Sequence, residues 1–170
     1  MYDLGMLRLM ADHNHWMNEK IYAVCATMHD AERKRDLGAF FRSVHGTLNH
    51  LLLVDHLWMG RILADPFPIR SLDQELYTDF SPLQVAQEKM DGDIHTFVAE
   101  LTSARLAKPV NYVSFLGKQP VSLPLGLVLT HLFHHRTHHR GQVSTLALQL
   151  GYEVGVTDMI YMPGAARHFI

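Results

Sequence analysis

Five of the chain's thirteen histidines lie within positions 131–139, in the stretch HLFHHRTHHRGQ at 131–142. Imidazole is the commonest side-chain ligand for metal ions and the side chain that titrates closest to neutral pH. The flanking residues have the pattern of an apolar helix. The cluster therefore predicts metal binding, provided that at least two of the rings point to the same place.

The helical pattern separates these histidines by face, because residues four apart share a face and adjacent residues diverge. Written in heptads, one inward row is Leu125, Leu132, His139 and Leu146, and the row beside it is Val128, His135, Gln142 and Gln149. His135 and His139 thus replace apolar residues at two successive inward positions. We expect His131 at the edge of this face, with His134 and His138 to its side.

Two unpartnered imidazoles are costly in an apolar core, and a bound metal would remove that cost. A third ligand has to come from a facing helix. The candidates are His45, His50 and His56 in one predicted helix, and His13 and His15 in another. Periodicity alone does not choose among them, although His50 lies in the middle of its helix.

These histidines need long helices to hold them. Apolar residues at spacings of three and four predict helices at 3–28, 36–63, 82–104 and 124–151. Asp36 is the expected N-cap of the second helix, and Ser81 with Pro82 the expected start of the third. The pattern predicts an all-α, single-domain chain over residues 1–170.

The segments between the helices complete the predicted fold. Residues 64–80 contain two prolines and lack periodicity, which indicates a long middle connection. Residues 108–123 allow a short hairpin before the fourth helix, although Pro120 limits its pairing. Residues 152–170 form an irregular tail. Four amphipathic helices with these connections predict an up-and-down four-helix bundle.

Charge and composition exclude some classes of function. The formal net charge is -2, without the basic excess typical of nucleic-acid binding. No stretch of about twenty residues is apolar enough to span a membrane. The single Cys25 permits no internal disulfide, which fits a reducing, cytoplasmic setting, and we expect it to be a small core residue.

Other residues near the histidines have two interpretations each. Asp55 and Trp58 follow His50 and are either a surface carboxylate and a packing residue or part of the rim of the site. Gln142 is positioned to orient a substrate or water, whereas Gly141 would allow close helix packing.

Several motifs resemble the DinB family of damage-inducible bundle proteins. They are TLNHLLLVDHLWMGRIL at 47–63, LTHLFHHRTHHRGQVSTLALQLG at 129–151 and GVTDMIYMPG at 155–164. The first helix also matches, with Asn14, Trp16 and Asn18. Either asparagine would bond within the bundle or face a pocket.

The resemblance implies a homodimeric four-helix bundle that holds a divalent metal through His50, His135 and His139. It thus selects the same pair in the last helix that the apolar rows selected. We expect Zn²⁺ or Ni²⁺, since imidazole suits both. His56 and His134 remain additional candidate ligands.

We expect a metal-dependent enzyme of hydrolytic or thiol-transfer type, acting on a small molecule such as a thiol. Three histidines and one open position are typical of catalytic zinc. The alternative is a non-catalytic stress-associated protein in which the metal is structural. DNA binding, which the family name suggests, is disfavoured by the net charge.

Overall fold

The computed structural model describes residues 2–115 and 117–169. Its four long helices are α1 (Leu4–Ala26), α3 (Val44–Leu63), α4 (Phe80–Ala99) and α6 (Leu125–Gln149). The short elements are α2 (Asp30–Arg33), α5 (Ser103–Leu106), the strands β1 (Pro109–Val113) and β2 (Pro120–Pro124), and the 3-10 helices η1 (Met159–Tyr161) and η2 (Ala165–Phe169). Over the described residues, the fold is predominantly helical with one two-stranded hairpin, which agrees with the sequence-based prediction.

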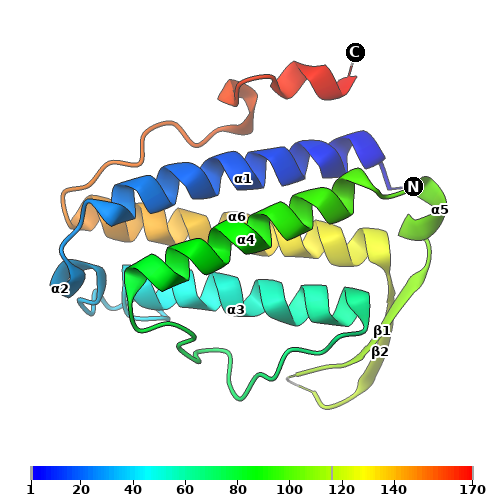
Figure 1. The fold of residues 1–170 in the computed structure, drawn as a ribbon, viewed down its shortest axis with the longest axis horizontal. Helices are drawn as coiled ribbons and strands as arrows, with labels where there is room; N and C mark the ends of the chain where they lie inside the picture. Colours follow the sequence, from blue (N-terminus) through cyan, green and yellow to red (C-terminus); the bar gives the residue numbers. More distant parts are fainter. Residues whose placement is uncertain (1, 116, 170) are drawn as a thin grey trace.

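The directions of the four long helices differ from the predicted up-and-down arrangement, in which each helix is antiparallel to the one before it. Both α1 and α3 pack against α4 and α6. Figure 1 shows that α3 and α4 run in the same direction, because the 64–79 connection returns along the length of the bundle. The 20-residue α3 is about 30 Å long, and an extended chain covers that distance in about ten residues. A connection of this length allows two successive helices to be parallel.

The apolar faces of the four long helices meet in one continuous core. Ile21, Leu52, Ile94 and Leu129, one from each long helix, are fully buried in it. Among the described residues, no helix combines the length and the apolarity that crossing a bilayer requires.

The start of α3 was predicted too early. Ser43, not Asp36, is the N-cap, and its Oγ accepts a hydrogen bond of 3.0 Å from the Gly46 amide. Residues 39–42 instead form a tight turn in which Arg42 has a left-handed φ of 67°. Phe40, which falls within the predicted 36–63 helix, lies in this turn and is 84% exposed. The prediction was too early because the apolar residues of this turn have the same spacing to Val44 and Leu48 as residues of one more helical turn would have.

The third long helix also begins and ends earlier than predicted. Asp79 precedes its first residue, Phe80, so Pro82 lies within the first turn, where proline is tolerated. The helix ends at Ala99, and Ser103–Leu106 form the separate helix α5.

The hairpin before α6 has the predicted location. Strands β1 and β2 are antiparallel, with Val110 opposite Leu123 and Val113 opposite Pro120. Pro120 is the first residue of its strand, where a missing N–H does the least damage to the ladder.

Candidate metal centre

Three histidines from two long helices converge at one point. His50 projects from α3, and His135 and His139 project from α6. One ring nitrogen of each lies within 4.8 Å of the others, and the Nε2 atoms of His50 and His135 are 3.3 Å apart. A tetrahedral metal with Zn–N bonds of about 2.0–2.1 Å separates two ligand nitrogens by about 3.3–3.4 Å. The observed spacing therefore suits a metal ion held between them.

Two of the three rings are oriented by hydrogen bonds at their outer nitrogens. The Nδ1 of His50 lies 2.7 Å from the Leu72 carbonyl, and the Nδ1 of His139 lies 2.7 Å from the Gln142 Oε1. Because both partners accept, each Nδ1 carries the proton and each Nε2 keeps its lone pair. The Nδ1 of His135 is buried without a hydrogen-bond partner among the described residues.

Burial keeps these histidines neutral. It lowers the pKa of His50 to about 4, against the raising effect of the Leu72 carbonyl. It lowers the pKa of His135 to about 3, and the neighbouring His139 and His50 rings lower it further. The pKa of His139 is lowered by the same cause. Near pH 7, protons therefore do not compete with a metal for the three rings.

An aromatic ring covers one side of the cluster. Phe41 stacks on His50 with ring centroids 3.8 Å apart and meets His139 edge-on at 5.6 Å. This close approach depends on Gly46, because a Cβ at that position would collide with the Phe41 carbonyl. The ring limits the access of water to His50 from that side.

The remaining histidines of α6 lie where the apolar rows predict. His134 and His138 are exposed. His131 is exposed at the margin, edge-on to Trp58 at 5.1 Å and with its ring centroid 6.0 Å from that of His135. Trp58 is buried and borders the site through His131.

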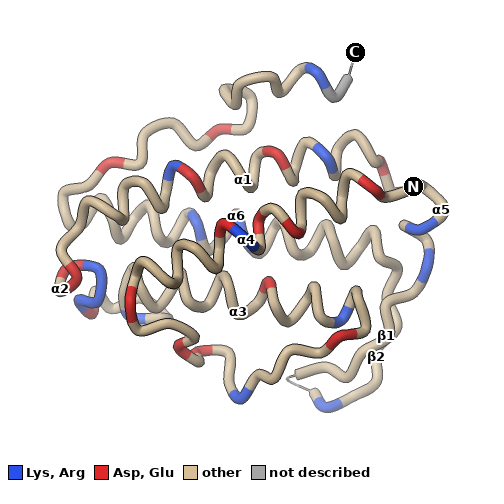
Figure 2. Tube along the Cα trace, in the orientation of Figure 1, with Lys and Arg blue, Asp and Glu red and all other residues tan. Residues whose placement is uncertain are grey.

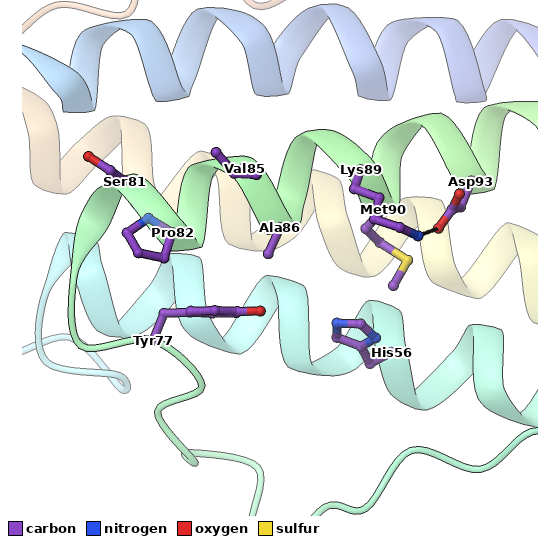
Figure 3. Close-up of a pocket in the computed structure, with 9 residues that line it drawn as sticks. All are labelled: His56, Tyr77, Ser81, Pro82, Val85, Ala86, Lys89, Met90 and Asp93. Atoms are coloured by element: carbon purple, nitrogen blue, oxygen red, sulfur yellow. Dashed lines mark hydrogen bonds and ion pairs between the residues drawn. The ribbon is translucent and has the colours of Figure 1, made fainter.

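The other candidate third ligands point elsewhere. His45 bonds to the Tyr77 carbonyl at 2.8 Å, and His13 bonds to the Thr157 carbonyl at 3.1 Å. His15 is exposed and lies 3.4 Å from a Glu19 oxygen. His56 stacks on Phe67 and lines a separate groove of about 660 Å³ between α3 and α4 (Figure 3). Spacing alone did not separate these histidines from His50.

A buried ionic network next to the cluster was missed by the sequence-based reasoning. The Arg136 guanidinium, 1% exposed, contacts the carboxylates of Asp55 and Asp91, the latter at 2.8 Å. Charged positions of α4 and α6 thus meet in the middle of the bundle (Figure 2). Asp55 is fully buried, so its interpretation as a surface carboxylate is wrong. The sequence did contain one indication that Arg136 is buried. It lies seven residues from both Leu129 and Val143, and therefore on the same inward face of the helix.

Polar side chains from α1 and α4 complete this network. Asn18 donates to both Asp91 oxygens, at 3.0 and 2.8 Å, and Asn14 donates to one of them at 3.3 Å. Both asparagines therefore bond within the bundle, and Asn18 also lines a cavity of about 350 Å³. Gln87 donates to Asp55 at 3.0 Å. Burial raises the pKa of Asp55 to about 6, against the lowering effects of Arg136 and Gln87.

Gln142 orients a ring of the cluster, and Gly141 does not serve close packing. Gln142 also donates to the Nε2 of His138 at 3.3 Å, so its amide is held at both ends. A methyl group at Gly141 would meet nothing within 4 Å. Gln149, predicted in the same inward row as Gln142, is exposed.

Replacing Gln142 by leucine should weaken metal binding about 10- to 100-fold, because the His139 ring loses the acceptor that fixes its tautomer. Competition with a metallochromic chelator measures this affinity. Gln149→Leu, an exposed position two turns further along α6, is the matched control and should bind metal as the unmodified protein does. Equal affinities for the two variants would contradict the orienting role of Gln142.

The fold and the cluster together define a class: four-helix-bundle proteins with a candidate three-histidine metal site. Within it, the chain belongs to the DinB family, whose model matches residues 1–167. This confirms the resemblance that the sequence motifs indicated.

Individual relatives are distant but similar over most of their length. Protein DinB of Bacillus subtilis (strain 168) is 22% identical over 166 residues, covering 86% of this chain and 87% of the relative. A solved DinB-like protein from Bacillus cereus ATCC 10987 superposes with a TM-score of 0.59 at 19% identity, over 82% of this chain and 89% of that one.

A second solved structure, YfiT from Bacillus subtilis, also has a TM-score of 0.59, at 14% identity and over 85% of this chain and 87% of that one. It is described as a probable metal-dependent hydrolase with an unusual four-helix bundle topology. At these identities, the two superpositions support the fold.

Proposed function

We propose that the chain is a metal-dependent enzyme that carries out hydrolysis or thiol transfer on a small molecule, with Zn²⁺ or Ni²⁺ held by His50, His135 and His139. The observation that carries the proposal is the convergence of three neutral imidazoles with two nitrogens 3.3 Å apart. Imidazole suits both metals. The description of YfiT as a probable metal-dependent hydrolase supports the same class of reaction.

The donor set favours catalysis over a closed structural site. Within the described residues, the cluster contains three ligating side chains, whereas structural zinc usually has four. A metal with an open position lowers the pKa of a bound water or stabilises a thiolate. The protein's own residues would then orient the ligands through Leu72 and Gln142 and shield one side through Phe41.

Cobalt substitution tests whether a coordination position is open, because bound Co²⁺ reports its ligands by its visible spectrum. We expect 2-mercaptoethanol to add a thiolate-to-cobalt charge-transfer band, or acetohydroxamate to shift the ligand-field bands. A response to the thiol alone favours thiol transfer, and a response to the hydroxamate alone favours hydrolysis.

The same titration separates the enzyme from the alternative, a stress-associated protein with a structural metal. If neither ligand changes the cobalt spectrum, the position is closed and the enzyme proposal fails. His135→Ala, which lacks one proposed ligand, serves as the control for cobalt bound elsewhere. The homodimer and the cytoplasmic location stay predictions, and light scattering during gel filtration tests the first of them.

A further inference from the structure

Arg140 is a buried cation without a carboxylate partner. Its side chain is 4% exposed, and it donates to the Asn14 Oδ1 and, at 3.3 Å, to the Thr137 Oγ1. No carboxylate among the described residues lies within ion-pair distance of its guanidinium, whereas Arg136, one turn earlier, contacts two. Burial and the Arg136 charge lower the pKa of Arg140 to about 9, against the raising effects of Asp91 and Asp55, so the guanidinium is charged near pH 7. Buried charges in proteins are normally paired directly, whereas Asp91 and Asp55 act on Arg140 only from beyond contact distance.

The nearest carboxylates are already occupied. Asp55 and Asp91 both contact Arg136. The Asn14 amide lies between Arg140 and Asp91, since its oxygen accepts from Arg140 and its nitrogen donates to Asp91. A neutral amide therefore separates Arg140 from the closest negative charge. The two aspartates balance the charges of Arg136 and Arg140 in number but contact only Arg136, and an anion from outside the protein would give Arg140 a direct ion pair.

A cavity opens beside Arg140. It has a volume of about 270 Å³ and lies between α1, α6 and the C-terminal tail. Figure 1 shows the tail running back along α1, where His13 bonds to the Thr157 carbonyl. The cavity walls that matter for binding are the polar Arg140, Thr137 and His13 and the apolar Met10, Phe133 and Met159.

The cavity is mostly apolar, and Arg140 supplies its one formal charge among the described lining residues. No aspartate or glutamate is among the described residues that line it. Burial lowers the pKa of His13, against the raising effect of the Thr157 carbonyl, and the nearby Arg140 charge lowers it further. A volume below that of drug-sized pockets limits the ligand to about ten non-hydrogen atoms.

We propose that this cavity binds a small organic carboxylate. The carboxylate pairs with the Arg140 fork, whose geometry matches two oxygens, and the apolar body lies against Met10, Phe133 and Met159. A single arginine in an apolar cavity suits a monoanion with an apolar body better than a strongly hydrated inorganic dianion. The site is separate from the histidine cluster and does not depend on the proposed enzyme function.

Calorimetry with hexanoate as the probe tests the class of ligand, with hexanamide and sulfate for comparison. We expect hexanoate to bind with a Kd on the order of 1 mM, at least about tenfold tighter than either comparison compound. Equal binding of hexanamide would show that charge is irrelevant, and tighter binding of sulfate would show an inorganic-anion site. Either result, or no binding of hexanoate at about 50 mM, would overturn the proposal.

A pair of adjacent substitutions tests the location. Met159→Glu places a carboxylate at the cavity wall, where it competes for Arg140, and should weaken hexanoate binding at least about tenfold. Ile160→Glu adds the same charge at a neighbouring side chain that is 78% exposed, and should leave binding unchanged. The proposal fails if the two variants bind alike. Arg140→Gln, if it folds, should also lose binding.

Because carboxylates also bind metals, the titration is repeated with His135→Ala. Hexanoate should bind this variant as it binds the unmodified protein. Loss of binding would place the carboxylate at the histidine cluster and contradict the Arg140 site. If hexanoate still binds this variant, the Arg140 site stands even where the cobalt experiment contradicts the proposed enzyme function. The two proposals can therefore fail separately.

Discussion

His50→Ala, His135→Ala and His139→Ala should each reduce the bound divalent metal from about one equivalent per chain to about one tenth or less. The reason is the small ligand set, because the cluster contains three ligating side chains within the described residues. Removing one leaves two imidazoles, which do not retain zinc through dialysis at ordinary concentrations. Elemental analysis of dialysed protein measures the effect.

His134→Ala and His56→Ala are the matched controls. His134 lies next to His135 but is exposed, and His56 stacks on Phe67 in the groove of Figure 3. Both variants should retain the full equivalent. If His134→Ala lost as much metal as His135→Ala, the assignment of the inward pair would be wrong.

Circular dichroism of the same metal-free variants separates binding from folding. The four long helices share one continuous core of apolar side chains, whose burial stabilises the bundle. We therefore expect the alanine variants to keep their helical signal and a cooperative melt. Gross unfolding of His135→Ala would instead indicate that metal binding supplies folding free energy.

Arg136→Met should lower the free energy of unfolding by about 3–5 kcal/mol, because it leaves Asp55 and Asp91 buried without their shared cation. For a chain of this size, such a loss lowers the Tm by roughly 10 °C. Methionine keeps a long apolar stem, so lost packing contributes little. Urea titration and thermal melts measure the change.

Two controls isolate the buried charges. Arg167→Met removes an arginine that pairs with Asp12 while 65% exposed, and surface pairs of this kind contribute about 0–1 kcal/mol. Adding Asp55→Asn and Asp91→Asn to Arg136→Met removes the uncompensated charges and should restore more than half of the loss. A small effect of Arg136→Met, similar to that of Arg167→Met, would show that water reaches the network.

Two of the three histidines in the cluster could be predicted from the spacing of residues in one helix. A helix fixes the relative directions of its own side chains, so the apolar rows placed His135 and His139 inward and His134 and His138 aside. His50 could not be chosen this way, since periodicity within one helix does not determine which residue of another faces it. The family resemblance supplied that choice.

The errors in the fold share a cause. Phe40 and Phe41 continued the apolar spacing of α3, but the turn at 39–42 and the Ser43 cap make the helix begin only after them. Helical spacing is a local pattern, and it does not reveal that Phe41 packs on His50 from outside the helix. The parallel course of α3 and α4 depended on the path of the 64–79 connection, which has no periodicity.

The sequence by itself determined the helical class, the hairpin and the inward pair of histidines, because these follow from contacts between residues close in the chain. Only the tertiary structure decided the relative directions of α3 and α4 and the pairing of Arg136 with two aspartates. The same holds for the absence of a carboxylate at contact distance from Arg140 among the described residues. Those features depend on which faces of distant helices meet. A buried charge is neutralised by whatever lies opposite it, and the linear sequence does not specify that partner.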